Sequence, residues 1–154
     1  MAEKNAEVIA ALNDLVETCK DAEQGFRNAA ESIQKDGDAG LRTLLNALAQ
    51  QRARFAAELQ NEVLHRGGDP AKSGHVSAGF QRGWMNLNLA LGGHSEASII
   101  TECESSEQSA MRNYEAALKT SLPSDLFAIV QEQHAEIKLA HSRLRALERA
   151  LKAG

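Results

Sequence analysis

The chain has 154 residues and carries 17 Lys and Arg against 21 Asp and Glu, which gives a formal net charge of −4. Only 4% of its residues are aromatic, and no segment shows the alternation of Val, Ile or Thr with polar residues that marks a strand. This composition favours a single all-α domain over residues 1–154. It argues against nucleic-acid binding, because the basic residues are scattered among acidic ones.

The sequence also bears on the compartment. No apolar run approaches the roughly 20 residues of a membrane span, and residues 1–5 are polar and lack a signal-peptide core. We therefore expect a cytoplasmic protein without a membrane partner. Cys19 and Cys103 fall at predicted core positions, where buried, reduced thiols are typical of a reducing compartment.

A first helix is predicted over residues 5–35, because its apolar residues repeat at spacings of four and three, the pattern of a bundle helix. These residues are Val8, Leu12, Leu15, Cys19, Ala22, Phe26, Ala29 and Ile33. Glu23 interrupts the neighbouring apolar row near the middle of the helix. The short turn at residues 36–40 then allows only an antiparallel return.

A second helix is predicted over residues 39–65. Its inward row consists of Leu41, Leu45, Leu48, Arg52, Phe55, Leu59 and either Glu62 or Val63. Arg52 lies on this row and Glu58 on the neighbouring one, so both are candidates for the interior. An inward Arg near inward Glu side chains is what a salt-bridged core would use in place of a metal. Gly67, Gly68 and Pro70 are expected to end the helix.

Residues 71–94 form a connection that is too long for a tight helix hairpin and is suited to crossing the length of a bundle. Within it, Phe80, Trp84, Leu87 and Leu91 repeat at spacings of four and three, which predicts a short amphipathic helix across the bundle, with Trp84 as a core plug. Ser95 is the predicted N-cap of the next helix.

A third long helix over residues 99–118 places carboxylates where a helix normally buries carbon. Its inward stripe is Ile100, Cys103, Glu107, Ala110, Tyr114 and Ala117. Glu107 lies on this stripe and Glu104 on the neighbouring row. Because burying an unpaired carboxylate costs several kcal/mol, Glu107 implies a metal, a proton, a cation or water inside.

The last helix follows the capping signal at Pro123 and Ser124. Its central rows are Val130, Ile137, Leu144 and Leu151 and, beside them, Phe127, His134, His141 and Glu148. The two histidines stand about 10 Å apart along the axis, so one metal ion cannot take both. Each is either a core histidine bonded to a carboxylate or a metal ligand.

The first and third helices share a short repeat: Cys19, Glu23 and Gln24 recur 84 residues later as Cys103, Glu107 and Gln108. The helix, turn, helix, long connection, helix, turn, helix pattern likewise consists of two similar halves. If a pseudo-two-fold axis relates the halves, Glu23 and Glu107 lie at similar depth in one core.

Several segments give the chain a resemblance to known proteins: LNDLVETCKD at residues 12–21, GGDP at 67–70, RGWM at 82–85, ECE at 102–104 and AH at 140–141. The chain resembles the ferritin-like superfamily and, more closely, a bacterial family of ferritin-like four-helix bundles whose domain is of unknown function. The resemblance implies an up-down-down-up four-helix bundle with a long crossover, in a bacterial cytoplasmic protein linked to stress.

The superfamily holds two metal ions between a Glu on the first and third helices and Glu-x-x-His on the second and fourth. The second helix of this chain offers no histidine at an inward position, and both His134 and His141 lack the Glu three residues before them. We therefore expect a degenerate site without ferroxidase activity, in a protein that acts through its surface.

Two alternatives stay open at this point. The first is an iron or zinc protein, or an oxidase, with Glu23, Glu107, His141 and His134 as candidate metal ligands. The second is a thiol or soft-metal role for Cys19 and Cys103. A weak homodimer through exposed helix faces is the expected assembly.

Overall fold

The computed structural model describes residues 2–33, 37–72 and 96–153, and four long helices account for most of them. They are α1 (Ala2–Ser32), α2 (Ala39–His65), α4 (Glu96–Leu118) and α5 (Ser124–Ala153). No strand occurs within these ranges, which confirms the all-α prediction. The bounds of α2 match the predicted ones, whereas α1 starts and stops a little earlier than expected. The predicted crossover helix, Trp84 and Ser95 lie outside the described residues.

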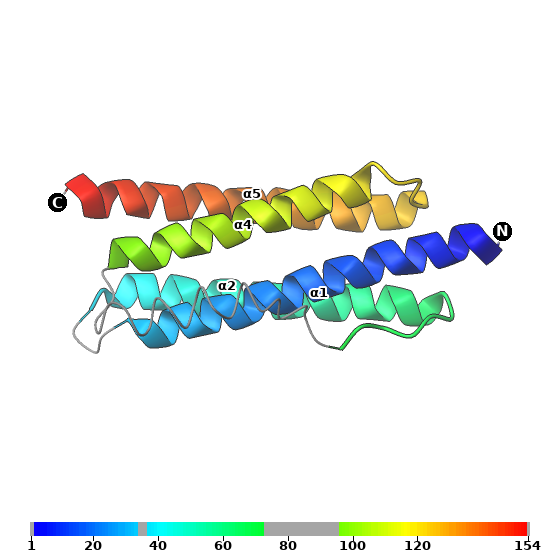
Figure 1. The fold of residues 1–154 in the computed structure, drawn as a ribbon, viewed down its shortest axis with the longest axis horizontal. Helices are drawn as coiled ribbons and strands as arrows, with labels where there is room; N and C mark the ends of the chain where they lie inside the picture. Colours follow the sequence, from blue (N-terminus) through cyan, green and yellow to red (C-terminus); the bar gives the residue numbers. More distant parts are fainter. Residues whose placement is uncertain (1, 34–36, 73–95, 154) are drawn as a thin grey trace.

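The four helices form two hairpins, α1 with α2 and α4 with α5, which lie one above the other in Figure 1. The hairpins meet mainly along α1 and α4, while α2 and α5 approach each other at few positions. α2 and α4, like α1 and α5, face each other diagonally. In Figure 1, α2 and α4 run from left to right and α1 and α5 from right to left, so neighbouring helices are antiparallel.

The two ends of α2 are set by Asp38 and by Gly67, of which the sequence analysis singled out Gly67. Asp38 caps its first turn, since its Oδ1 accepts a hydrogen bond from the backbone N–H of Leu41 at 3.1 Å. At the other end Gly67 adopts a φ of 78°, in the left-handed region that glycine tolerates best. Asn13 of α1 then holds the following loop, donating to the carbonyl of Asp69 at 3.0 Å and accepting from the N–H of Ala71 at 2.8 Å.

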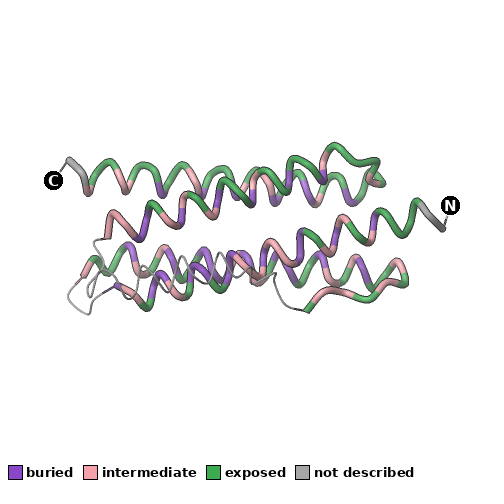
Figure 2. Tube along the Cα trace, viewed as in Figure 1, coloured by how far each residue is buried: buried purple, intermediate pink, exposed green. Residues whose placement is uncertain are grey.

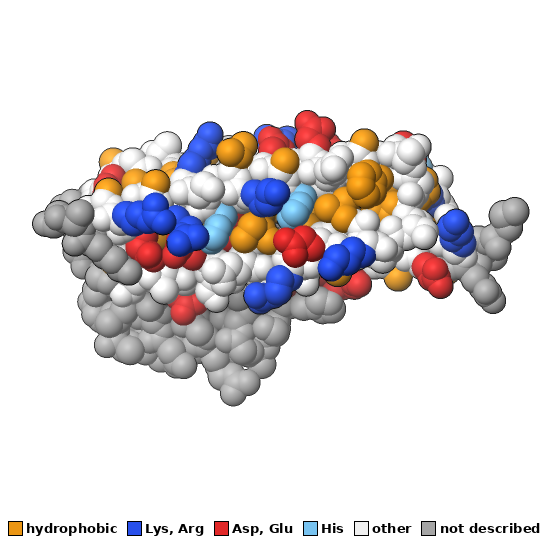
Figure 3. Space-filling view, turned by 90° about the horizontal axis from the view of Figure 1, so that it is seen from above, with side chains coloured by type: hydrophobic (Ala, Val, Ile, Leu, Met, Phe, Trp, Pro, Cys, Tyr) orange, Lys and Arg blue, Asp and Glu red, His pale blue; other side chains and the backbone are white. Residues whose placement is uncertain are grey.

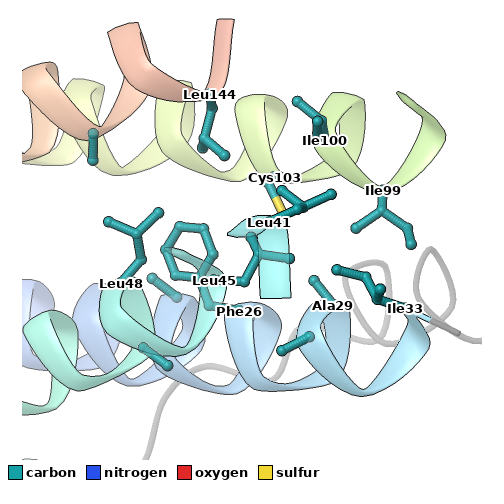
Figure 4. Close-up of a cluster of buried hydrophobic side chains, with 14 residues drawn as sticks. Phe26, Ala29, Ile33, Leu41, Leu45, Leu48, Ile99, Ile100, Cys103 and Leu144 are labelled. Atoms are coloured by element: carbon teal, nitrogen blue, oxygen red, sulfur yellow. The ribbon is translucent and has the colours of Figure 1, made fainter. Parts of the chain in front are cut away.

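The predicted inward stripes of α1, α2 and α4 are buried, as Figure 2 shows in purple. The buried apolar side chains gather into two separate clusters along the bundle. One contains Phe26, Leu45 and Cys103, and Figure 4 shows its side chains converging from all four helices. The other contains Leu15, Phe55 and Tyr114. Each cluster draws on every helix, so both hairpins are joined at both ends of the core.

Two expectations about side chains were wrong. Glu58 is an exposed residue, because it lies on the flank of α2 and only its carboxylate reaches inward. On α5 the row through Phe127, His134 and His141 is turned partly to solvent, and Phe127 is 37% exposed. The buried stripe of α5 runs instead through Leu126, Val130, Gln133, Ile137, Ala140 and Leu144.

Candidate functional site

A layer of polar side chains crosses the middle of the bundle. Each helix contributes one buried polar residue: Glu23 from α1, Arg52 from α2, Glu107 from α4 and Gln133 from α5. Along α2 the change from one apolar cluster to the other falls at Arg52, and along α4 it falls at Glu107. We call these four residues the polar layer, because they bring charged and hydrogen-bonding groups into an otherwise apolar core.

Arg52 and Glu107 form an ion pair at the centre of the layer, with both side chains 0% exposed. Nη2 of Arg52 donates to Oε2 of Glu107 at 2.6 Å, and Nη1 lies 2.6 Å from Oε1 without hydrogen-bond geometry. Nε of Arg52 donates to the side-chain oxygen of Gln51 at 3.2 Å. Because α2 and α4 are diagonal, this pair spans the core rather than one helix interface.

Glu23 belongs to the layer by burial, but its ionic partners lie on its own helix. Its carboxylate contacts Nη2 of Arg27 at 2.7 Å and Nζ of Lys20 at 3.5 Å, both of which reach toward solvent. The repeat therefore places both Glu23 and Glu107 inward, as predicted, and gives them different environments. Glu107 is neutralised from across the core, whereas Glu23 is neutralised from the surface.

A chain of hydrogen bonds runs beside the ion pair and touches all four helices. The hydroxyl of Tyr114 donates to the side-chain oxygen of Gln133 at 2.7 Å, so the Cys19 thiol, 3.0 Å away, donates to Tyr114. Gln133 in turn donates through Nε2 to Oε1 of Glu58 at 3.0 Å. The hydrogen bonds thus all run in one direction, from the Cys19 thiol to the carboxylate of Glu58.

The two cysteines are buried and unbridged, as predicted. Burial raises the pKa of the Cys19 thiol to about 11, against the lowering effects of the Tyr114 hydrogen bond and the Arg52 charge. Burial likewise raises the pKa of Cys103, and the charge of Glu107 adds to the effect. Cys19 and Cys103 belong to different apolar clusters, so the structure does not bring them together.

Both histidines are half-buried, and His134 faces α4. The ring of His134 stacks on Tyr114 with centroids 6.3 Å apart, and its Nε2 lies 3.8 Å from Oε1 of Glu115. Desolvation, with a contribution from Lys138, lowers the pKa of His134. Within the described part of the chain, Nε2 of His134 and Nε2 of His141 are buried and have no hydrogen-bond partner.

The residues present do not fit the two-metal centre that the fold resemblance implies. Among residues 2–33, 37–72 and 96–153, no group of three or more His, Cys, Asp or Glu side chains lies close enough to hold a metal ion. The carboxylate of Glu107 is instead occupied by the guanidinium of Arg52.

Sequence reasoning missed Gln133 and the hydroxyl of Tyr114 as parts of the layer. A signal for Gln133 exists, because the four-three repeat through Leu126, Val130, Ile137 and Ala140 passes through position 133. For Tyr114 the stripe indicated burial, and a buried phenol normally finds a hydrogen-bond partner.

Comparison with known proteins places the chain in a family without assigning a chemistry. No helix within the described ranges combines the length and hydropathy that a membrane span requires. No curated protein gives a significant match. A family model described as a domain of unknown function, DUF2383, matches residues 7–120, which is most of the chain, and the protein therefore belongs to this family.

Proposed function

We propose that this chain is a ferritin-like bundle protein in which an internal arginine takes the place of a metal, and that it acts through its surface without oxidising iron. The buried Arg52–Glu107 pair carries the proposal. A unit positive charge within about 5 Å of a divalent ion raises the energy of that ion by several kcal/mol at an effective dielectric near 20. Glu107 is also withdrawn as a ligand, because its carboxylate is already neutralised.

The arrangement of the helices supports the ferritin-like part of the proposal. Neighbouring helices are antiparallel, and the second and third long helices are diagonal to each other. A connection between two diagonal, parallel helices has to run the length of the bundle, as in up-down-down-up bundles with a long crossover. The short helix in that crossover remains a prediction.

A metal-binding role is the second candidate, favoured by the buried Nε2 atoms of His134 and His141 that have no partner among the described residues. With Glu23 and Glu107 these histidines are the ligands predicted for iron or zinc. The separate locations and raised thiol pKa values of Cys19 and Cys103 support a packing role for both cysteines over a redox pair.

The surface supports an interaction role without nucleic acid. Figure 3 shows acidic and basic side chains interspersed on the face in view, rather than a field of one sign. A weak homodimer is proposed as the assembly, and light scattering that gives the mass of many subunits would rule it out. The bacterial origin, the cytoplasmic location and the link to stress remain predictions from the resemblance.

The test is aerobic iron oxidation with metal analysis. Apo-protein is mixed with ferrous iron in air, ferric formation is followed against a buffer blank, and bound iron and zinc are measured after desalting. We expect the rate of the blank and no stoichiometric metal. Two tightly held irons per chain with accelerated oxidation would overturn the proposal, and loss of that activity in Glu107→Ala would locate the centre. Zinc that is retained by the wild type and lost in His141→Gln would establish the second candidate instead.

A further inference from the structure

The face of α5 that points away from the core carries a large apolar side chain at its centre. Opposite the buried stripe of this helix runs a row of residues at spacings of three and four, and every member of the row is exposed. The row, which we call the α5 face, consists of Ala128, Glu132, Ala135, Leu139, Ser142, Ala146 and Ala150. Leu139 lies at the middle of the row and is 60% exposed, the largest exposed fraction among the large hydrophobic residues that the structure describes.

The charged residues of α5 are divided between its two ends. Residues 124–137 contain no Lys or Arg, and their acidic residues are Asp125, Glu132 and Glu136. Residues 138–153 contain one acidic residue, Glu148, whose carboxylate is turned toward α4 and accepts a hydrogen bond from Thr101 at 3.0 Å. The other charged residues of this half are Lys138, Arg143, Arg145, Arg149 and Lys152. The first half of α5 is therefore acidic and the second half basic, and the sign changes next to Leu139.

The neighbouring helix α2 shows the same division in the reverse order along the chain. Its first half contains basic residues and no acidic ones, and its second half contains acidic residues and no Lys or Arg; those on its surface are Arg42, Arg54, Glu58 and Glu62. Nη2 of Arg66, directly after α2, lies 3.2 Å from Oδ2 of Asp125, near the start of α5. The acidic half of α2 thus lies beside the acidic half of α5. The side of the bundle formed by these two helices has one acidic and one basic end.

The charges on this side are only partly neutralised within the chain. Arg66 contacts Asp125, but neither Glu136 nor Arg143 has an ion-pair partner among the residues that the structure describes. Like charges that gather at one end of a surface repel one another, so this division does not stabilise the isolated chain. A surface with the opposite order of charges would relieve the repulsion at both ends.

A second copy of the chain supplies such a surface when the two α5 helices are antiparallel. A two-fold axis at Leu139 places the acidic end of each copy against the basic end of the other. Glu136 stands three residues before Leu139 and Arg143 four residues after it, so the two share one flank of the α5 face. The same axis therefore brings Glu136 of each copy beside Arg143 of the other. Parallel α5 helices would instead oppose like charges.

The packing and the size of this side agree with a second copy as the occupant. Leu139 meets its own equivalent at the axis, and the small side chains of Ala135, Ser142 and Ala146 on either side of it let the two helices approach closely. With a rise of 1.5 Å per residue and a diameter of about 10 Å for each helix, α2 and α5 together offer at most roughly 800 Å² per copy. This area is about that of one partner in a standard interface. A dimer that uses part of it is weak.

We propose that two copies of the chain associate through antiparallel α5 helices, with a two-fold axis at Leu139 and with Glu136 of each copy paired with Arg143 of the other. This inference rests on the homodimer proposed above and gives it a face and an orientation. It does not depend on the proposed lack of iron chemistry.

Sedimentation velocity of the full chain, over a wide range of protein concentrations and at low and high salt, tests the face. We expect a dimer that forms as the concentration rises and that weakens at high salt, because salt screens the charges. Leu139→Glu places two carboxylates at the axis and should leave a monomer. Its circular dichroism should match that of the wild type, since Leu139 is exposed. Arg112→Glu, at an exposed position of α4, is the control and should keep the dimer.

Charge reversals test the orientation. Glu136→Arg alone and Arg143→Glu alone each oppose like charges across the axis, and each should raise the dissociation constant of the dimer by about tenfold or more. The double variant restores opposite charges within one kind of chain. An equimolar mixture of the two single variants restores them between two kinds of chain. Both should recover an affinity close to that of the wild type.

The possible failures have different meanings. If Leu139→Glu dimerises as strongly as the wild type, the inference is overturned, while the homodimer itself stands and uses another face. If the wild type stays monomeric at every concentration, both the inference and the proposed homodimer are overturned, and the α5 face is left to a different protein. If both single reversals weaken the dimer but neither the double variant nor the mixture recovers it, the antiparallel pairing is overturned.

Discussion

The guanidinium of Arg52 lies over the ring of Phe26, with its Cζ 5.3 Å from the ring centroid. The cation is thus held on one face by an aromatic ring and at one edge by the carboxylate of Glu107. A planar, delocalised charge suits both contacts at once, whereas the compact ammonium of lysine suits neither geometry. The buried pair is therefore specific for arginine.

Removing the positive partner is expected to destabilise the bundle strongly. Arg52→Met leaves Glu107 buried without a counter-charge and should lower the free energy of unfolding by about 3–5 kcal/mol. Arg52→Met combined with Glu107→Leu should recover most of this loss, because two apolar side chains replace two buried charges. Urea unfolding followed by circular dichroism measures all three proteins. A double variant as unstable as the single one would contradict the assignment of the loss to an unpaired charge.

Removing the hydroxyl of Tyr114 is expected to lower the free energy of unfolding. Tyr114→Phe keeps the packing but leaves the Cys19 thiol and the side-chain oxygen of Gln133 without their shared partner, which should cost about 1–3 kcal/mol. The same substitution made in a Gln133→Met background should cost clearly less, because one of the two orphaned groups is gone. Equal costs in both backgrounds would show that the chain of hydrogen bonds does not act as a unit.

Both thiols should resist modification in the folded protein. The pKa of Cys19 is raised to about 11, so almost none of it is thiolate at pH 8, and the raised pKa of Cys103 has the same effect. An aromatic disulfide reagent at pH 8 should label neither within the time that labels both in urea. Rapid labelling of either thiol in native buffer would contradict their burial in the core.

His134 should make the protein less stable in mild acid. Its pKa is lowered in the folded state, chiefly by desolvation, so the unfolded chain binds the proton more readily. The free energy of unfolding therefore falls as pH drops from about 6.5 toward the lowered pKa of the folded protein. His134→Gln should flatten the pH dependence in this window, whereas His65→Gln, an exposed control, should leave it unchanged. Thermal unfolding from pH 7.5 to 5 measures the difference.

Gly68 is expected to tolerate no side chain. A Cβ there would lie 2.8 Å from Cγ2 of Ile9 and 2.9 Å from Cγ1 of Val63, so the loop would have to move off α1. Gly68→Ala should lower the free energy of unfolding by about 1–3 kcal/mol. Gly40→Ala is the matched control, because its Cβ would meet only the side-chain oxygen of Asp38, at 3.1 Å, and alanine favours the helix. Similar losses in both variants would contradict a steric cause.

The interior positions of the charged residues were largely predictable from spacing. The four-three repeats alone place Arg52, Glu107 and Glu23 on inward faces, because side chains three and four apart share a helix face. The end of α2 at Gly67 was also predictable, since it depends on the conformational preference of one residue.

The pairing of these residues was not predictable. Whether Glu107 meets Arg52, a histidine or a metal depends on which helices are diagonal, and that is a property of the packed bundle rather than of any one stripe. The burial of Gln133 was not predicted. Neighbouring rows of side chains on a long helix drift by about 20° per heptad, so either of two adjacent rows can face the core. Glu23 pairs with Arg27 of the same helix, four residues on, which is a favourable spacing for an ion pair. The inward position of Glu23 pointed instead to a partner across the core.

The division of the core at Arg52 and Glu107 has a consequence for how substitutions combine. Side chains that share no contact partner usually contribute independently to stability, within about 0.3–0.5 kcal/mol. Leu45 belongs to one cluster and Leu126 to the other. Truncating both should therefore reduce stability by the sum of the single effects, whereas truncating Leu45 and Phe26, which share a cluster, should not be additive. The two ends of the molecule can then vary separately, and either one can be repacked by design or by mutation while the other keeps its side chains.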